Sequence, residues 1–374
     1  MQEKATGRNP LGDRTLGPVE TGDAIHVVVL FGGRSAEHDV SCVTAAHVLR
    51  ALDLDRYTVT VIGIDRSGTW HLAESAMNAL GTTLPETLSA EGPEVAASSV
   101  LAATSAAGLP VVILPLLHGP QGEDGTVQGL IELADLPYVG SGVLGSAVSM
   151  DKAIAKAVLS AADIPQPRYR ALQDKDVSPE SVAEAVTALG LPVFVKPANM
   201  GSSIGVSKAR TLEEVERAVR LALDYDRWIL IEEAVNGREI EVAVLGNDAP
   251  EASVAGEIVP AKEFYDYEDK YVTSGARLLV PAPLSDDASR TVRDLALRVF
   301  GTLRGSGLAR VDFFYEENGR GFLCNEMNTM PGFTPISMYP KLWEATGVSY
   351  SRLIDRLIAF ALERHQLQRR NTSR

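Results

Sequence analysis

The sequence predicts a mixed fold that joins an α/β domain to α+β units, and three patterns support this prediction. An apolar run at residues 26–31 ends in Gly32-Gly33, which is typical of a buried parallel strand. A helical segment at 41–52 and a second strand at 58–64 follow, and this alternation indicates a parallel sheet. The sequence contains no internal repeat of fixed period. Functional groups of such sheets gather at the carboxyl ends of the strands, so we expect a site there.

The later elements follow from turn and capping residues. A further buried strand at 109–117 ends in His118-Gly119, and helix 178–190 begins with Ser-Pro and stops at a glycine. The middle of the chain predicts a smaller α+β unit with elements at 149–162, 167–171, 178–190, 193–196, 212–225 and 228–233. The last unit is expected to contain elements at 239–245, 253–259, 278–281, 286–304 and 350–364.

Composition limits the possible partners. At 374 residues the chain is long enough for two or three domains, and its formal net charge of −14 argues against nucleic acid or an anionic membrane. Cys42 and Cys324 are the only cysteines, so a disulfide framework and a cysteine zinc site are excluded. Residues 1–23 lack the apolar run of a signal peptide and are interpreted as a disordered tail. No segment approaches the roughly 18 apolar residues of a membrane span, and we expect a cytoplasmic protein.

The most informative segment reads as two strands joined at Glu317-Asn318-Gly319, where Asn-Gly suggests a turn with positive φ. Alternation places Arg310 and Asp312 on one face of the first strand. If the loop holds an odd number of residues, Glu326 and Asn328 of the second strand share that face. These groups indicate a hard-cation site beside an anion site, with Mg²⁺ carrying a nucleotide polyphosphate. The alternative is a solvated hairpin face with a surface ion pair.

Two glycine-containing loops give weaker signals. Lys196 ends a strand and precedes the small-residue loop 197–205, whose backbone N–H groups can cradle phosphate. The chain contains no Walker A motif, and an exposed turn with a lysine is an equal alternative for this loop. The segment 140–145 matches G-x-G-x-x-G but lacks the strand and acidic residue of a dinucleotide site. We interpret it as a flexible connection between domains.

Other candidates are ordinary when taken singly. Glu232 and Glu233 end an apolar strand, where acids are usually solvated but can also accept from a ribose hydroxyl. The irregular stretch 264–271, rich in aromatic and acidic residues, fits a lid over a ligand. Lys152 and Lys270 are surface residues by default.

Taken together, these segments resemble the D-alanine–D-alanine ligases of the ATP-grasp superfamily. The likeness extends from about residue 26 to 360 and is much more specific than any single motif. It rests on the ordered strings at residues 32–41, 118–129, 140–152, 196–205, 265–271 and 325–334.

The resemblance implies an ATP-grasp fold with an N-terminal Rossmann-like (preATP-grasp) domain. The implied divisions are a tail at 1–23, a substrate-binding domain at 24–145, a central lobe at 146–234, a C-terminal lobe at 235–366 and a tail at 367–374. ATP would lie between the two lobes and phosphorylate the carboxylate of one D-alanine. The amine of a second D-alanine would then displace phosphate, giving D-alanyl-D-alanine for peptidoglycan synthesis. Family members are commonly homodimers.

The same resemblance assigns site residues by role. Two Mg²⁺ or Mn²⁺ ions would be held by Asp312, Glu326 and Asn328. The implied nucleotide site consists of Lys152, Lys196, Ser202, Ser203, Glu232, Glu233, Val235, Glu239, Lys270, Asn325 and Glu326. The implied D-alanine sites consist of Glu37, His118, Arg310, Gly332, Ser337 and Met338. The implied catalytic groups are Glu37, Ser202, Tyr271, Arg310 and the Gly332 N–H.

One departure and two alternatives accompany this assignment. Some family members carry a lysine at Glu233 that contacts the adenine edge, so nucleotide selectivity is open, although ATP is expected over GTP. Tyr271 resembles dipeptide-forming members, which predicts D-alanine rather than D-lactate as second substrate at neutral pH. Another ATP-dependent carboxylate–amine ligase is the first alternative. A non-catalytic two-lobed binding protein is disfavoured, because a receptor needs neither paired metal carboxylates nor several lysines around one phosphate chain.

Overall fold

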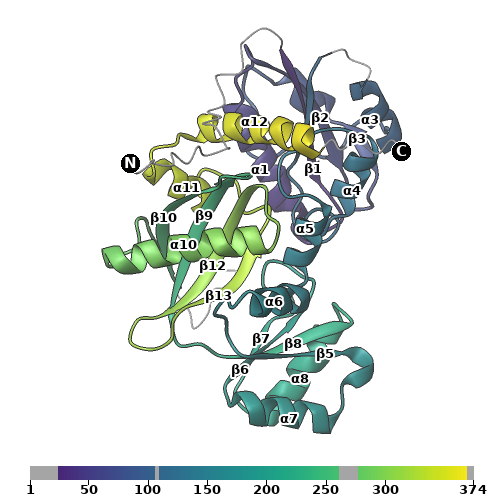
Figure 1. The fold of residues 1–374 in the computed structure, drawn as a ribbon. Helices are drawn as coiled ribbons and strands as arrows, with labels where there is room; N and C mark the ends of the chain where they lie inside the picture. Colours follow the sequence, from purple (N-terminus) through teal and green to yellow (C-terminus); the bar gives the residue numbers. More distant parts are fainter. Residues whose placement is uncertain (1–23, 106–108, 261–276, 369–374) are drawn as a thin grey trace, which may run out of the picture.

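The computed structural model describes residues 24–105, 109–260 and 277–368, which form three sheets arranged one after another along the molecule (Figure 1). The predicted tail at 1–23 and the predicted lid at 264–271 lie outside the described residues. The mixed fold expected from the sequence is confirmed. Within the described ranges, no helix is both long and apolar enough to cross a membrane.

The first sheet has the strand order β3-β2-β1-β4, with β1 parallel to β2 and β4. Its strands are β1 (Ile25–Gly32), β2 (Tyr57–Ile64), β3 (Trp70–Leu72) and β4 (Val111–Pro115). Its helices are α1 (His38–Ala51), α2 (Glu74–Asn78), α3 (Ala97–Ser105) and α4 (Thr126–Leu133). Residues 27–31 of β1 are fully buried, as the apolar run predicts. Because β1 and β4 are parallel, the glycine-containing turns after both strands meet at one edge.

The second sheet is antiparallel, with the order β5-β8-β6-β7. Its strands are β5 (Tyr169–Gln173), β6 (Val193–Pro197), β7 (Ser207–Ala209) and β8 (Trp228–Glu233). Its helical elements are η1 (Asp174–Asp176), α7 (Pro179–Leu189) and α8 (Leu212–Leu223). The predicted start of α7 is confirmed, since Ser178 accepts from the Ser181 N–H, and Thr211 caps α8 by accepting from the Glu214 N–H. The short strand β7 was not predicted from the sequence.

The third sheet is also antiparallel, with the order β11-β10-β9-β12-β13. Its strands are β9 (Arg238–Gly246), β10 (Glu251–Val259), β11 (Arg277–Leu279), β12 (Gly307–Glu316) and β13 (Gly321–Asn328). Its helices are α10 (Asp286–Thr302) and α11 (Met338–Ala345). They cover opposite faces, since Val242 and Val244 of β9 belong to the cluster of α10, whereas Ala243 and Leu245 belong to that of α11.

The β12–β13 turn differs from the sequence prediction in two respects. Residues 317–320 connect the strands, so the loop holds an even number of residues and the condition of an odd number is not met. The positive φ lies at Gly321, at 78°, and not at Gly319. With an even loop and regular pairing, Glu326 and Asn328 would lie on the face of the sheet opposite to Arg310 and Asp312.

A β-bulge restores the predicted face. Asp312 pairs with Glu326, but the next residue of β12, Phe313, pairs with Cys324. Asn325 is therefore the extra residue on β13, and its insertion shifts the register by one position. The acidic groups come together for this reason, which the sequence alone did not reveal.

Two helices meet between the first and second sheets where one was predicted at 149–162. They are α5 (Val143–Met150) and α6 (Lys152–Ala161), and the Asp151 side chain between them caps α6. The interpretation of residues 140–145 as a flexible connection is wrong, because this segment starts α5. Gly145 packs so closely that a Cβ would lie 2.4 Å from a backbone oxygen.

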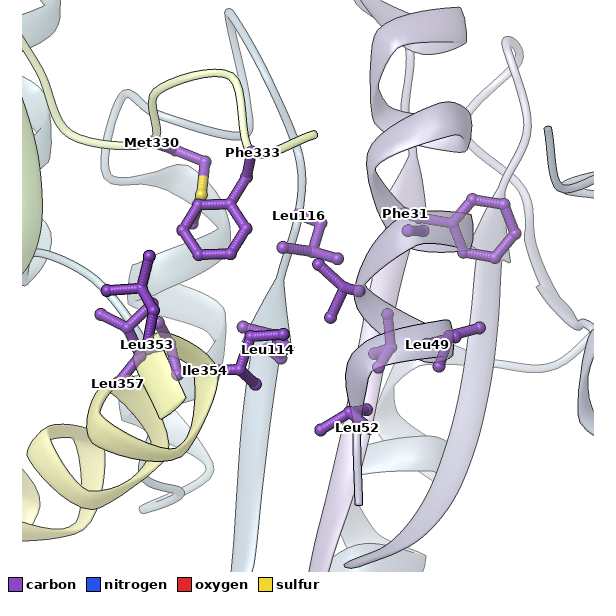
Figure 2. Close-up of a cluster of buried hydrophobic side chains, with 14 of the residues drawn as sticks. Phe31, Leu49, Leu52, Leu114, Leu116, Met330, Phe333, Leu353, Ile354 and Leu357 are labelled. Carbon is purple, nitrogen blue, oxygen red and sulfur yellow. The ribbon is translucent and has the colours of Figure 1, made fainter. Parts of the chain in front are cut away.

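The last helix, α12 (Tyr350–Gln368), returns to the first sheet (Figure 1). Figure 2 shows its side chains facing β4, with Ile354 near Leu114. The same buried cluster takes in Met330 and Phe333 from the loop after β13. The second sheet and its helices have a separate core. The first sheet and the C-terminal part of the chain therefore share one core.

Candidate active site

The residues assigned from the sequence lie around one cavity of about 1450 Å³, lined by parts of all three sheets. The assigned residues in its wall are Glu37, His118, Lys152, Lys196, Ser202, Ser203, Glu232, Glu233, Val235, Glu239, Arg310, Asp312, Asn325, Glu326, Asn328, Gly332, Ser337 and Met338. Lys270 and Tyr271 lie outside the described residues.

The acidic pair on β12 and β13 faces this cavity. Arg310 donates through Nε and Nη2 to the two carboxylate oxygens of Asp312, each at 2.7 Å. Asn328 donates to Asp312 at 3.0 Å from the opposite strand. The side chains of Asp312 and Glu326 are only 13% and 26% exposed and line the cavity. This placement rejects the alternative of a solvated hairpin face.

Arg310 has a second partner that sequence reasoning missed. Its Nε lies 3.0 Å from Glu241 Oε2 on the neighbouring strand β9. Burial alone would lower the pKa of Arg310, but Asp312 and Glu241 outweigh it and raise the pKa well above its ordinary value. The guanidinium therefore stays charged in the cavity wall. The available signal was strand alternation, since Glu239 and Glu241 lie on the same face of β9.

The donor set around Asp312 fits a hard divalent cation. Two carboxylates and an amide oxygen, completed by water and phosphate oxygens, are ligands that Mg²⁺ prefers. Among the described residues, no cluster of three or more His, Cys, Asp and Glu side chains forms a metal site. A cation bound here would therefore need Asn328 and the phosphates of a ligand to complete its coordination.

A buried carboxylate connects two lysines beside the small-residue loop at 197–205. Glu232 Oε1 lies 3.0 Å from Lys196 Nζ, and Oε2 lies 3.0 Å from Lys156 Nζ. Burial alone would raise the pKa of Glu232, but the two lysines outweigh it and lower the pKa. Burial lowers the pKa of Lys156. Lys156 was not assigned from the sequence, although it follows Lys152 by one helical turn.

The small-residue loop brings two serines to the cavity and contacts a lysine at the start of α6. Lys152 Nζ donates to the Met200 carbonyl at 2.6 Å and lies 3.7 Å from Glu326 Oε2. Ser202 and Ser203 have φ values of 48° and 59°, in a region that non-glycine residues seldom occupy. Such strain in a cavity wall is typical of functional loops.

Glu37 lies between this loop and the first sheet. Its carboxylate accepts from the Ser202 hydroxyl. A Cβ on either Gly119 or Gly201 would lie 2.7 Å from Glu37 Oε2, so two glycine backbones enclose the carboxylate. Glu37 is 7% exposed and is thus poised for a cationic group from the cavity.

The loop after His118 contacts the loop after β13. His118 Nδ1 lies 3.1 Å from the Met330 carbonyl, and the Met330 N–H donates to Glu123 at 3.1 Å. Glu123 also accepts from the Gly119 N–H at 2.7 Å. Burial lowers the pKa of His118; burial and the nearby Glu37 raise the pKa of Glu123 to about 8. Glu123 lies in the string at 118–129 but was given no role from the sequence.

Glu233 lies in the cavity wall, but its carboxylate is engaged. It accepts from the Arg168 N–H and Nε at 2.9 and 2.7 Å, and from Arg320 in the β12–β13 turn. Burial alone would raise the pKa of Glu233, but these donors outweigh it and lower the pKa. Where some family members carry a lysine, this chain therefore has a glutamate whose carboxylate is bound by two arginines. Val235 and Glu239 continue the wall toward β9.

A helix N-terminus also lines the cavity, away from Glu233. Ser337 is the N-cap of α11, and Met338 is its first residue. The Ser337 hydroxyl accepts from the Thr334 N–H at 3.2 Å, which shapes the loop that contains Gly332. Backbone N–H groups at a helix N-terminus favour a carboxylate or phosphate.

Comparisons with known proteins agree with this geometry. Residues 26–141 match the family described as D-ala D-ala ligase N-terminus, and residues 158–359 match D-ala D-ala ligase C-terminus. The D-alanine--D-alanine ligase of Bacillus pumilus is 46% identical over 350 residues, covering 91% of this chain and 97% of that protein. The relative from Shouchella clausii is 47% identical over 354 residues, covering 91% and 95%.

Solved structures give the same result. The D-alanine-D-alanine ligase of Coxiella burnetii matches with a TM-score of 0.78 and 35% identity, covering 93% of this chain and 96% of that one. The VanG D-Ala:D-Ser ligase of Enterococcus faecalis matches with a TM-score of 0.77 and 33% identity, covering 90% and 99%. The chain therefore belongs to the D-alanine–D-alanine ligase family of ATP-grasp enzymes, which join D-alanines at the expense of ATP for peptidoglycan precursor synthesis.

Proposed function

We propose that the cavity ligates two D-alanines in two steps through a D-alanyl phosphate. The observation that carries this proposal is the opposition of charges across one cavity. Asp312 and Glu326 line one side, while Lys152 and Lys196 approach from the second sheet and α6. Phosphoryl transfer depends mainly on positioning and on electrostatic stabilisation, and this arrangement suits both.

We propose that Asp312, Glu326 and Asn328 hold two Mg²⁺ or Mn²⁺ ions together with the phosphates of ATP. Bound there, the ions would neutralise charge on the phosphate oxygens during transfer. Lys152 and Lys196 would contact the phosphates, and Ser203 and Asn325 complete this part of the wall. Lys270 would add a further contact when the lid closes.

The nucleoside of ATP would lie at the opposite end, among Glu232, Glu233, Val235 and Glu239. Because the carboxylate of Glu233 is occupied by two arginines, base selection would fall to backbone groups and to Glu232 with Lys196. The expected nucleotide remains ATP over GTP. Competition between the two nucleotides for turnover measures this selectivity.

The first D-alanine would place its ammonium at Glu37 and its carboxylate toward Arg310 and the Gly332 N–H. His118 would contact it from the first sheet, and Ser202 would orient Glu37. Arg310 and the Gly332 N–H would stabilise the oxyanion that forms when the second amine attacks. Tyr271 is proposed to close the site from the lid.

The second D-alanine would direct its carboxylate to Ser337 and the Met338 N–H at the start of α11. The expected second substrate is D-alanine, although one structural relative is named a D-Ala:D-Ser ligase. Parallel assays with D-alanine, D-serine and D-lactate at pH 7.5 decide this point. Higher turnover with D-serine or D-lactate would contradict the expectation.

A coupled assay tests the function as a whole. ADP should form only when D-alanine and Mg²⁺ are both present, and D-alanyl-D-alanine should appear in equal amount. Strong turnover with another acid and amine, and none with D-alanine, would favour a different carboxylate–amine ligase. Binding without ATP turnover would favour a binding protein.

Three further proposals concern context. The domain boundaries at 145 and 234 are proposals, and limited proteolysis tests them. We also propose that the enzyme is a homodimer, which analytical sedimentation tests. A cytoplasmic location agrees with the use of ATP and is tested by fractionation.

A further inference from the structure

Glu123 stands between the two ends of the proposed site for the first D-alanine. One carboxylate oxygen accepts from the Gly119 N–H at 2.7 Å, and the other accepts from the Met330 N–H at 3.1 Å. Gly119 lies in the loop after β4 and packs against Glu37. Met330 belongs to the loop after β13, two residues before Gly332.

His118 reinforces the same connection. Its Nδ1 lies 3.1 Å from the Met330 carbonyl, which can only accept, so this nitrogen carries the proton. The backbone N–H and C=O of Met330 are thus both held by side chains of one loop, residues 118–123. A residue held through both groups has its peptide planes fixed in orientation.

Apolar packing alone does not provide this orientation. Met330 and Phe333 are buried in the core that joins α12 to the first sheet (Figure 2). Such contacts are non-directional and fix where the loop lies, but not how its N–H groups point. Directional hydrogen bonds are needed for a donor that must meet an oxyanion within a few tenths of an ångström.

We propose that Glu123 is a positioning residue that fixes the orientation of the Gly332 N–H relative to the Glu37 carboxylate. The amine of the first D-alanine would then meet Glu37 while its carboxyl group meets the Gly332 N–H. This inference rests on the proposed function. Glu123 acts through Met330 and Gly119 and takes no part in the chemistry itself.

Glu123→Gln is the sharpest test, because it keeps the volume but replaces one accepting oxygen with an NH₂ group. That group would face a backbone N–H, so one of the two hydrogen bonds is lost. Since a misplacement of about 1 Å can cost 10²-fold in rate, we expect kcat to fall about 10- to 100-fold. The KM for ATP and the affinity for MgADP should change less than about twofold, and Tm should change little because the apolar packing remains.

Asp124→Asn is the matched control. Asp124 is the next residue and also accepts two backbone N–H groups, from Gln121 at 2.8 Å and Thr126 at 2.9 Å. These bonds stay within its own loop, so the variant should retain kcat within about threefold. Equal losses in both variants, or a loss of Tm and MgADP binding that parallels kcat in Glu123→Gln, would overturn the proposal.

If Glu123→Gln does not fold, Glu123→Asp serves instead. It keeps the carboxyl group but is one methylene too short to reach both N–H groups, so the same selective loss of kcat is expected. Unchanged kcat in a folded variant would refute the positioning role. The wild-type enzyme is measured in the same series with ATP and D-alanine. Absence of dipeptide from the wild type would refute the proposed function, whereas an active wild type with an equally active Glu123→Gln refutes only this inference.

Discussion

Exchange of Lys156 for methionine probes the buried charges beside the small-residue loop at 197–205. Lys156 is 1% exposed, and its only described carboxylate partner is Glu232, at 3.0 Å. The other oxygen of Glu232 keeps Lys196. Methionine fills most of the same volume without a charge, so the change tests electrostatics with little cavity formation.

The magnitude follows from the burial of both groups. Removing one partner of a buried ion pair costs about 3–5 kcal/mol. Because Lys196 still compensates Glu232, we expect the lower end, about 3 kcal/mol, which for a chain of 374 residues corresponds to a fall of roughly 4 °C in Tm. Lys196 would also be drawn toward Glu232 and away from phosphate, which should raise the KM for ATP.

Thermal unfolding of a double-mutant cycle is the assay. Glu232→Gln removes the other charge of the Lys156–Glu232 pair, so the double variant should be more stable than the sum of the single changes by at least about 1 kcal/mol. Lys175→Met, at an exposed lysine of the same lobe, is the control and should stay within about 0.5 kcal/mol of the wild type. A Lys156→Met protein with unchanged Tm and an additive cycle would refute the reasoning.

Three other changes test separate parts of the site. Glu326→Gln should reduce kcat at least about 100-fold with little change in Tm, because the side chain faces the cavity and not the core; loss of folding would contradict this. Gly201→Ala would place a Cβ 2.7 Å from Glu37 Oε2, so the KM for D-alanine should rise while the KM for ATP is retained. Arg320 lowers the pKa of Glu316 from 4.5 to about 2 by hydrogen bonding, a contribution present above pH 4.5 and lost as the pH falls toward 2. Thermal melts of Arg320→Ala should therefore show a small destabilisation at pH 6 that disappears near pH 2, and a constant difference would refute it.

The sequence predicted the sheets well because their signals are local. The apolar run of β1 and the caps of α7 and α8 depend on neighbouring residues, and the structure confirms them. The hairpin was harder, since its even loop and the bulge at Asn325 compensate for each other. Strand pairing decides such a register, and single-strand alternation does not reveal it.

Some of the site residues could be found from sequence motifs, and others were found only in the structure. Groups within the long, specific strings, such as Glu37 and Glu326, line one cavity in the structure. Lys156 and Glu241 were missed because their roles arise from burial against partners far along the chain. Glu123 was missed because its partners are backbone N–H groups, which carry no sequence signal.

The return of α12 to β4 divides the enzyme into two parts. In one part the first and third sheets share a core, and the other part is formed by the second sheet with its own helices. The first sheet, the third sheet and α12 are fused by continuous apolar contact, whereas residues 169–233 enclose an interior of their own. We therefore expect the second sheet to move when ATP enters, with the chain segments at 162–168 and 234–237 as hinges. The proposed amino-acid pocket would change with this movement, because Gly201 and Ser202 of the second sheet's loop contact Glu37, whereas Gly119 and Gly332 lie outside the second sheet.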